Sequence, residues 1–253
     1  MVLNDFTETH SHILPGIDDG SPDVETSLKM IAKLQAQGAK SIICTPHYYS
    51  DSLSLDDFLR KRNAAYETLK AALPAGSPKI LLGAEVYISR YLFGNENLQR
   101  IRIDSTKYAL IEHSFGEEFS EKAYDRLVSL LCDWGVTPIL AHIERYGALM
   151  ENTKTLDALL ELGCIAQVNI SSFADERRKI KKKLFKYLET GKIALIGSDC
   201  HNMTSRPPEY GEGAKEISLK CGRAALQKLI DNSNRLAAGE TCLLYTSPSP
   251  RDS

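Results

Sequence analysis

The chain has 253 residues, of which 43% are hydrophobic and 25% charged, so it can bury the core of one domain. Its formal net charge of -2 excludes a general attraction to nucleic acid or to an anionic membrane. No stretch approaches the ~20 apolar residues of a membrane span, and the start of the chain lacks the features of an export signal. We therefore expect a cytoplasmic protein without membrane insertion.

In chain order, short β-branched and apolar runs alternate with amphipathic helical patterns. The runs predict strands at residues 6–13, 41–47, 79–88, 107–113, 137–144, 164–171 and 193–199. The helical patterns lie at residues 23–37, 55–72, 120–134, 154–162, 176–190 and 211–232. This alternation is typical of βα units around a parallel sheet. Seven units without a compositional break favour a single α/β barrel, and a doubly wound open sheet is the alternative.

The end of the chain differs from the rest. The segment CLLYTSPSPRD, residues 242–252, resembles the in-frame translation of a transposase sequencing adapter. Its Pro- and Ser-rich composition without periodicity is compatible with that origin. We expect one domain over residues 1–241 and a non-native tail over residues 242–253.

The cysteines do not predict a metal cage or a disulfide framework. Six are present, at positions 44, 132, 164, 200, 221 and 242, and no two form a C-x-x-C pair. Most of them lie in apolar stretches, so we expect reduced thiols in the core.

Histidines and acidic residues gather at the ends of the predicted strands. All six histidines lie there: His10, His12, His47, His113, His142 and His201. The acidic residues in similar places are Asp18, Asp19, Glu85, Glu112 and Asp199. A lone histidine at a strand end is more often structural, but the carboxyl ends of parallel strands meet at one edge, and the pattern recurs at five of them. We infer a multinuclear metal centre, and imidazole with carboxylate suits Mn, Fe or catalytic Zn.

The segment IGSDCHNMTSRPPEY, residues 196–210, fits two kinds of phosphate chemistry. Cys200 and Arg206 have the C-x5-R spacing of a cysteine phosphatase, whereas Asp199 and His201 form an Asp-x-His metal pair. No glycine lies between Cys200 and Arg206, although a loop that wraps phosphate usually needs one. Alternation along the chain points Asp199 and His201 to one side and Cys200 to the other. We expect the metal pair to carry the chemistry.

Six motifs occur in order along the chain. They are THSHILPGIDDG (9–20), TPHY (45–48), GAEVY (83–87), LIEHSF (110–115), AHIERY (141–146) and SDCHNMTSRPP (198–208). The series resembles the polymerase and histidinol phosphatase (PHP) superfamily, and within it the bacterial manganese-dependent protein-tyrosine phosphatases of capsule and exopolysaccharide loci. The resemblance runs from about Phe6 to Arg235. It implies a distorted (β/α)7 TIM-like barrel that holds three Mn²⁺ ions, with Fe, Co or Zn as alternatives.

The resemblance also implies which residues hold each ion. The first metal ion would be held by His10, His12, Glu85 and Asp199. Glu85 would bridge to the second ion, which Glu112 and His142 complete. The third ion would be held by Asp19, His47 and His201. Two positions depart from the pattern: Glu8 stands where relatives usually have Asp, and His113 follows Glu112 where they often have an apolar or aromatic residue.

A trinuclear site of this kind would hydrolyse a phosphoester with a metal-activated water. Arg145 and Arg206 match family arginines and would grip the phosphate, with Asp199 and His201 completing the catalytic set. The implied substrate is protein phosphotyrosine, in the C-terminal tail of a bacterial tyrosine kinase that regulates capsule or exopolysaccharide synthesis. The alternatives are a small phosphoester such as histidinol phosphate, a phosphodiester, and a non-catalytic metal-dependent regulator.

Two further features have less specific interpretations. Residues 176–188, ERRKIKKKLFKYL, predict a basic helix. We interpret it as a solvated face with Ile180, Leu184 and Leu188 turned inward, rather than as a site for acidic partners or nucleic acid. The tyrosines at positions 48, 49 and 91 lie near the expected mouth of the site, where stacking on a substrate ring and ordinary packing both remain open.

Overall fold

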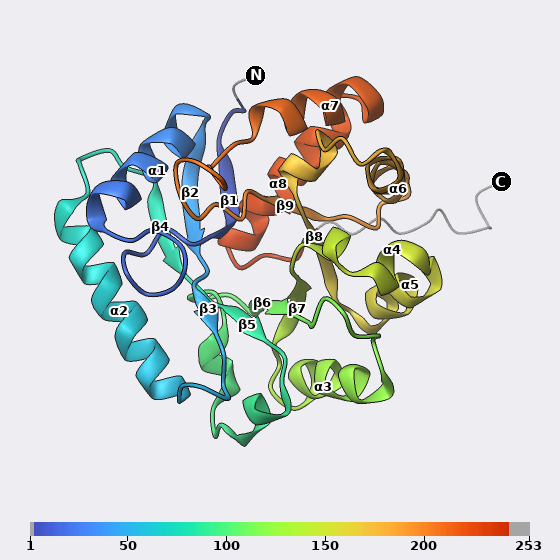
Figure 1. Cartoon of the computed structure of the whole chain (residues 1–253), viewed down its shortest axis with the longest axis horizontal. Coiled ribbons are helices and arrows are strands. Elements are labelled where there is room, and N and C mark those ends of the chain that lie inside the picture. The colour runs from blue at the N-terminus through green and yellow to red at the C-terminus, as the bar shows by residue number, and fades with distance from the viewer. Residues whose placement is uncertain (1–2, 243–253) are drawn as a thin grey trace.

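A computed structural model of the chain describes residues 3–242. Figure 1 shows helices arranged around a curled sheet. The strands are β1 (Phe6–Ser11), β2 (Ala39–Cys44), β3 (His47–Tyr48), β4 (Lys79–Leu82), β5 (Glu85–Tyr87), β6 (Tyr108–Glu112), β7 (Thr137–Leu140), β8 (Ile165–Asn169) and β9 (Leu195–Gly197). The helices are α1 (Val24–Ala36), α2 (Leu55–Ala72), α3 (Glu121–Cys132), α4 (Gly147–Glu151), α5 (Thr153–Leu162), α6 (Arg178–Glu189), α7 (Gly211–Cys221) and α8 (Arg223–Ala237).

The strand pairs are parallel and form two sheets, ordered β1-β2-β4 and β3-β5-β6-β7-β8-β9. Two of the predicted strands are interrupted, at Thr45–Pro46 and at Gly83–Ala84. Pro46 has no amide hydrogen to donate to a ladder. Hydrogen bonds still cross the interruptions, from Gly83 N to Cys44 O at 2.9 Å and from Glu85 N to Pro46 O at 3.0 Å. The chain therefore forms one α/β domain on a curled parallel sheet.

The first strand and the last described strand lie side by side. An isolated parallel bridge joins Ser11 to Cys200, just beyond β9. His12 N donates to Cys200 O at 2.9 Å, and Asp199 N donates to His10 O at 2.8 Å. These bonds bring the segments that follow β1 and β9 together at one end of the sheet.

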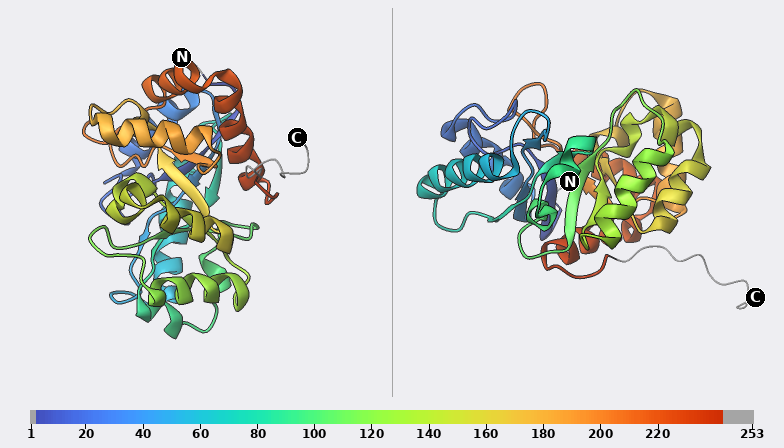
Figure 2. Two further views of the ribbon diagram at one scale, coloured as in Figure 1. Left: turned by 90° about the vertical axis from the view of Figure 1, so that its right-hand side faces the viewer. Right: turned by 90° about the horizontal axis from the view of Figure 1, so that it is seen from below.

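The core explains the nearly continuous apolar runs of the sequence. Every residue of β6 and of β8 is buried, as expected for strands that are covered on both faces. Figure 2 shows the helices packed around the sheet, and their buried residues are mostly apolar. In α6, for example, the buried residues are Leu184 and Tyr187. Within residues 3–242, no helix is long and apolar enough to cross a membrane.

The prediction of one helix over residues 211–232 is wrong. The structure has two helices here, because Gly222 separates α7 from α8 with a φ of 85°. Glycine adopts a positive φ at little cost because it has no Cβ, and the chain changes direction there. α8 then continues to Ala237, and its buried Leu229 and Leu236 extend the apolar face.

All six cysteines are free thiols, as predicted, and Cys44, Cys164, Cys200 and Cys242 are buried. Cys132, in contrast, is exposed. Cys242, the first residue of the expected tail, donates its amide to the Tyr108 hydroxyl oxygen at 3.3 Å. Residues 243–253 lie outside the described part of the chain. The boundary at residue 241 therefore stays a prediction.

Candidate metal centre

The predicted ligand residues come from separate βα segments and meet at one end of the sheet. His10 lies in β1, and His12 follows its last residue. Glu85 begins β5 and Glu112 ends β6, while His47 begins β3. His142 and Asp199 each lie two residues beyond the ends of β7 and β9. Parallel strands thus deliver side chains that are far apart in sequence to one place.

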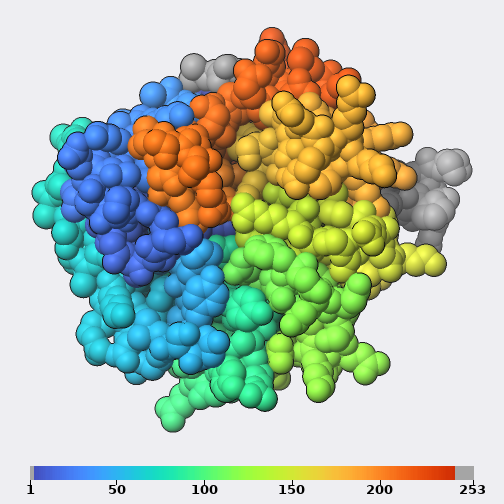
Figure 3. Space-filling model, in the orientation of Figure 1, coloured from blue at the N-terminus to red at the C-terminus, as the bar shows by residue number. Residues whose placement is uncertain are grey.

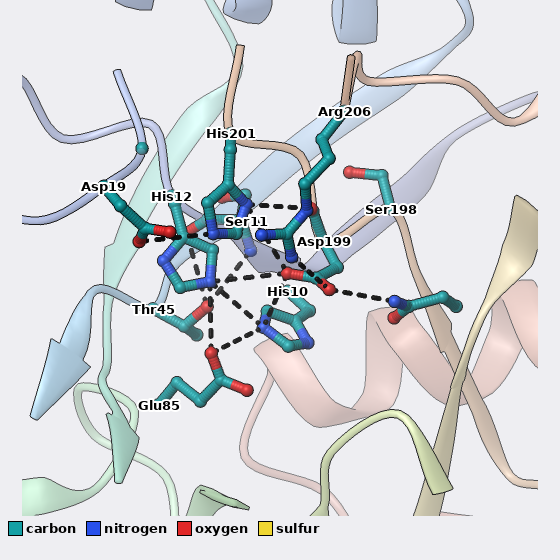
Figure 4. Close-up of polar contacts among 12 residues, drawn as sticks. His10, Ser11, His12, Asp19, Thr45, Glu85, Ser198, Asp199, His201 and Arg206 are labelled. Atoms are coloured by element: carbon teal, nitrogen blue, oxygen red, sulfur yellow. Dashed lines mark hydrogen bonds and ion pairs between the residues drawn. The ribbon is translucent and has the colours of Figure 1, made fainter. Parts of the chain in front are cut away.

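Figure 4 shows the first group of ligand atoms, from His10, His12, Glu85 and Asp199. All four residues are buried. The Nε2 atoms of both histidines lie 3.2 Å from Glu85 Oε2. They lie 3.4 Å and 3.5 Å from Asp199 Oδ1. Four donor atoms that converge in this way suit a divalent cation with imidazole and carboxylate ligands. This is the set that the sequence predicts for the first ion.

The neighbouring group is centred on Glu85 as well. His47, Glu85 and Glu112 offer atoms that lie within 4.8 Å of one another. His142 Nε2 lies 2.7 Å from Glu85 Oε1 and 3.6 Å from Glu112 Oε1. Glu85 therefore has one oxygen toward His142 and the other toward His10, His12 and His47. That position fits the bridging role predicted for it, and it also places His47 beside the second group.

The remaining group comprises His12, Asp19, His47 and His201. The Nε2 atoms of His47 and His201 both lie 3.5 Å from Asp19 Oδ1. Asp19 is the most open member, with 65% of its side chain exposed. The predicted third set is thus brought together at the mouth of the site, with His12 shared between this group and the first.

The donor atoms are not satisfied by the protein alone. Among the described residues, several buried polar atoms lack a hydrogen-bond partner, and those in the ligand groups are Glu85 Oε2, Asp199 Oδ1, His47 Nδ1 and His201 Nε2. Buried polar groups are normally hydrogen-bonded, because an unpaired one costs about 1–3 kcal/mol. Carboxylate and imidazole atoms left without partners and aimed at one another fit bound cations, which would use those lone pairs.

The pKa shifts of residues in the cluster also fit bound cations. Burial raises the pKa of Glu112 to about 7, and the nearby charge of Glu85 adds to that rise. Burial lowers the pKa of His201 to about 4, helped by the charge of His12. Like charges held close together in a buried site are relieved when a cation shares the carboxylates.

Residues around the ligands fix their positions. Burial opposes ionisation of Asp18, but its hydrogen bonds with His12 and with the amides of His47 and Gly20 hold its pKa at about 2. Asp18 Oδ2 lies 2.8 Å from His12 Nδ1, so the other ring nitrogen is turned toward the cluster. A carboxylate behind a metal-binding histidine orients its ring in this way. Asp18 is thus a neighbour of the candidate ligands.

Glu8 supports the first motif despite its departure from the family pattern. Its Oε1 accepts hydrogen bonds from His10 N at 2.9 Å and from Ser198 N at 3.0 Å. The extra methylene of Glu therefore still lets the side chain tie β1 to the segment that carries Asp199.

Two candidate ligand residues have unusual backbones. His142 and Asp199 are both non-glycine residues with positive φ, at 32° and 54°. Such conformations cost on the order of 1–3 kcal/mol and persist only where the surroundings hold them. Asn169 holds Asp199 by donating to its Oδ2 at 2.9 Å, and Gln167 Oε1 accepts from His142 N at 2.7 Å.

The two predicted arginines flank the cluster. Arg145 NH2 and Arg206 NH2 each donate to Asp199 Oδ2 at 2.7 Å. Their side chains remain 37% and 36% exposed. A guanidinium has five donors in a planar fork, so each arginine keeps donors that can reach an anion at the mouth of the site.

The segment from Cys200 to Arg206 does not form a phosphate-binding loop. The Cys200 side chain is fully buried in the apolar core, and burial raises the pKa of its thiol well above the usual range. The amides of His201 and Asn202 donate to Arg206 O. The amides of Thr204, Ser205 and Arg206 all donate to Asn202 Oδ1. A cysteine phosphatase would need such amides free for phosphate, so the Asp-x-His pair lies at the site and Cys200 does not.

Comparison with known proteins agrees with this geometry. The family described as "Capsular polysaccharide synthesis, CpsB/CapC" matches residues 6–238. This chain belongs to the CpsB/CapC family. It is 32% identical over 245 residues to the tyrosine-protein phosphatase CpsB of Streptococcus pneumoniae, with 90% of this chain and 97% of that protein covered. It is 30% identical over 237 residues to the tyrosine-protein phosphatase CpsB of Streptococcus agalactiae, with the same coverage.

A solved structure gives the same relationship. It comes from work on YwqE of Bacillus subtilis and CpsB of Streptococcus pneumoniae, described as unique metal-dependent tyrosine phosphatases. The TM-score is 0.81 at 26% sequence identity, with 94% of this chain and 97% of that chain covered. The family match, over residues 6–238, includes every segment that carries a candidate ligand.

His113 is not a member of the ligand groups. Its ring packs edge-on against Phe119, with 4.3 Å between the ring centroids, and its Nε2 lies 3.3 Å from Glu118 O. Phe115, two residues on, has its ring centroid 5.4 Å from that of His142 and is 48% exposed. Phe115, Gln167 and Asn169 were not predicted from the sequence. The signal for Phe115 was its place at the end of the LIEHSF motif.

Gly20 is required where the loop after His12 packs back on it. A Cβ at Gly20 would lie 2.2 Å from His12 O and 2.5 Å from His12 Cβ. We expect Gly20→Ala to push Asp18 and Asp19 away from their histidines and to lower activity by about 10²-fold, the cost of a displacement of about 1 Å. Phosphate release and metal content measure this effect. Gly94→Ala, where a Cβ would meet nothing within 4 Å, should leave both unchanged. Equal activity of the two variants would contradict the prediction.

Proposed function

We propose that this chain is a metal-dependent phosphatase that hydrolyses phosphotyrosine in proteins. The observation that carries the proposal is the buried cluster of imidazole and carboxylate atoms, several without hydrogen-bond partners, with two arginines at its edge. The proposal is supported by the similarity to tyrosine-protein phosphatases over nearly the whole chain.

The residues proposed as ligands are the nine predicted ones: His10, His12, Asp19, His47, Glu85, Glu112, His142, Asp199 and His201. We infer three ions, with Mn²⁺ as the native metal and Fe, Co or Zn as alternatives, because the donor atoms are nitrogen and oxygen without thiolate. When bound, such cations would lower the pKa of a coordinated water toward neutrality and neutralise phosphate charge.

The protein's own groups position the phosphate. Arg145 and Arg206 converge on Asp199 from different segments, and their partly exposed guanidinium groups lie where phosphate oxygens would arrive. Bidentate donors would hold the phosphate and stabilise the negative charge on its oxygens during transfer. Asp199 keeps both arginines in place, while Asn169 and Glu8 fix the segment that carries Asp199.

Aromatic side chains at the rim favour an aryl phosphate as the substrate. Figure 3 shows a hollow in the middle of the face that carries the loops after the strands. Tyr49 is 41% exposed and stacks on His47 with 5.4 Å between ring centroids. Phe115 lies on another side of the cluster, 5.4 Å from His142 and 5.7 Å from Tyr146. Exposed rings beside a phosphate site suit the phenyl ring of phosphotyrosine.

The three tyrosines near the expected mouth have different surroundings. Tyr48 is buried and packs against Phe58, and the ring of Tyr91 contacts Arg90. Of the three, Tyr49 is the one placed beside a proposed ligand. The phenol of tyrosine, with a pKa near ~10, is a tolerable leaving group even without a strong acid.

The finer predictions rest on the family. We propose that the substrate is the C-terminal tail of a bacterial tyrosine kinase that regulates capsule or exopolysaccharide synthesis, and that the protein acts in the cytoplasm. We also infer that the two sheets form one distorted (β/α)7 barrel. The bridge between Ser11 and Cys200 and the hydrogen bonds across the two interruptions support this closure.

Rates on three substrates, measured side by side with Mn²⁺, test the proposed function. We expect a phosphotyrosine peptide to be hydrolysed much faster than histidinol phosphate or a phosphodiester. A higher kcat/KM for histidinol phosphate would contradict the proposal and identify the protein as a phosphatase of small phosphoesters. Faster hydrolysis of the diester would identify it as a phosphodiesterase.

Phe115 should contribute to the choice of an aryl substrate. We expect Phe115→Ala to lower kcat/KM for a phosphotyrosine peptide by about 3–10-fold, the size of one aromatic contact. The slow rate on a phosphoserine peptide should not change, because that substrate has no ring. Val128→Ala, at an exposed position on α3, serves as the control. Equal losses on both peptides would mean that Phe115 acts on the metal site and not on the ring.

A further inference from the structure

The outer surface of α6 and α7 forms a strongly basic groove. The groove has a volume of about 1210 Å³, and we call it the α6 groove. Seven Lys or Arg side chains and two Glu side chains line it, a formal excess of five positive charges in a chain with a net charge of -2. An ion pair of 2.7 Å between Lys181 and Glu216 joins its two helices. Figures 1 and 2 show α6 lying beside α7.

The α6 groove continues toward the metal centre. A second cavity, of about 630 Å³, is lined by Arg145 at one side and by Lys179 and Lys183 of α6 at the other. These two lysines also line the α6 groove. Arg145 in turn donates to Asp199 in the ligand cluster. Arg177 is a fourth basic residue of this cavity, and Glu144 and Glu151 are its two acidic ones, so its excess of basic side chains connects the edge of the site with α6.

The α6 groove also offers apolar contacts. Leu219 of α7 is 69% exposed, the largest exposed fraction among the large hydrophobic residues that the structure describes, and it lines the groove with Phe185. In contrast, Leu184 and Tyr187 of α6 are buried in the domain. The open apolar side chains of the groove, Phe185 and Leu219, lie among seven basic ones, so a peptide could place acidic and apolar side chains there.

We propose that the α6 groove binds an acidic segment of the substrate polypeptide, next to the phosphotyrosine that enters the metal centre. The inference rests on the proposed phosphotyrosine hydrolysis. The basic groove is complementary in charge to an acidic peptide segment. Because the groove is continuous with the Arg145 cavity, this segment would belong to the same polypeptide as the phosphotyrosine. The solvated face that the sequence suggested for residues 176–188 then has a binding role.

The dimensions set the length of the acidic segment. Lys179 and Lys186 are seven residues apart, which is about 10 Å along a helix. An extended peptide covers that length with about three residues. The Arg145 cavity lies between the metal centre and the groove, so the acidic residues should begin a few positions away from the phosphotyrosine.

Matched peptides test the docking. Each carries one phosphotyrosine and a run of Glu that starts three residues before or after it, and the controls carry Gln instead. At low ionic strength we expect kcat/KM for one of the Glu peptides to exceed that of its Gln control by about 5–10-fold, as three surface ion pairs allow. The preference should disappear near 0.5 M salt, where charges are screened within about 4–5 Å.

The variant Lys179→Gln, Lys182→Gln, Lys186→Gln should remove the preference and leave the rate on the Gln peptides unchanged. These lysines are exposed, so folding should be unaffected. Its control is Lys29→Gln, Lys70→Gln, Lys122→Gln, which removes the same charge from exposed positions on α1, α2 and α3. A preference that survives in the first variant, or is lost equally in the control, would overturn the inference.

Direct binding separates this inference from the proposed function. Fluorescence anisotropy with a dye-labelled Glu peptide that carries unphosphorylated tyrosine reports docking without hydrolysis. Binding that depends on the three lysines, with no hydrolysis of any phosphotyrosine peptide, would support the groove and contradict the phosphatase. Hydrolysis of all phosphotyrosine peptides at equal rates, without lysine-dependent binding, would support the phosphatase and contradict the groove. If the protein binds phosphatidylglycerol vesicles through these lysines and does not bind the peptides, the partner of the groove is a membrane surface. That result would overturn the inference.

Discussion

Replacing Glu85 with glutamine should abolish activity, with a loss of kcat/KM of at least about 10³-fold. Glu85 Oε2 lies 3.1–3.2 Å from nitrogens of His10, His12 and His47, while its Oε1 lies 2.7 Å from His142. No other residue in the described chain belongs to both of the inner ligand groups. Changes to groups behind a metal ligand already cost about 10–100-fold, so the loss of a bridging carboxylate should cost more.

The same substitution at Glu144 provides the control for Glu85→Gln. Glu144 is also a buried carboxyl near the site, and burial raises its pKa to about 7, but it belongs to none of the ligand groups. Glu144→Gln should keep bound metal and most of the activity. Phosphate release and elemental analysis, measured on both variants after the same purification, test the ligand role of Glu85. Full activity and full metal content in Glu85→Gln would mean that the ligand assignment is wrong.

Asp199 and Cys200 should respond in opposite ways to substitution. We expect Asp199→Asn to lose at least about 10²-fold in kcat, because it removes a ligand charge and the anchor of Arg145 and Arg206. Asparagine tolerates the positive φ of Asp199 better than alanine does, so the loss would not come from backbone strain. Cys200→Ser should keep most of its activity per folded molecule, since the thiol packs in the core.

Thermal unfolding separates folding from chemistry in these two variants. A buried hydroxyl without a partner costs about 1–3 kcal/mol, so Cys200→Ser should unfold at a lower temperature than the wild type. Its activity should therefore be compared well below that temperature. An inactive but folded and metal-loaded Cys200→Ser, beside an active Asp199→Asn, would assign the chemistry to the cysteine.

The strand ends could be predicted from the sequence because two simple patterns, apolar runs and alternation of side chains, mark the strands. Apolar runs of four to eight residues mark buried parallel strands, and residues at i, i+2 share a face, as His10 and His12 do. The ligand set then followed from the family motifs. The structure brings eight of the nine candidates into three groups of converging ligand atoms and places His142 beside Glu85 and Glu112. It places His47 beside the second group as well as the third.

The rest depends on contacts that no local pattern contains. The interruptions at Pro46 and Gly83 and the helix break at Gly222 are set by how neighbouring segments pack, and a lone glycine or proline permits such a break without requiring it. Gln167 and Asn169 act through tertiary hydrogen bonds to His142 and Asp199. The α6 groove exists only because α7, some thirty residues later, lies beside α6.

Phosphate release from a phosphotyrosine peptide, before and after metal removal, tests the central claim most directly. The purified protein is dialysed against a chelator, the loss of metal is verified by elemental analysis, and Mn²⁺ is then added back. We expect activity to fall to about 1% or less without metal and to return with Mn²⁺, in the wild type and in Cys200→Ser alike. Undiminished activity in metal-free protein would contradict the metal centre as the origin of the chemistry.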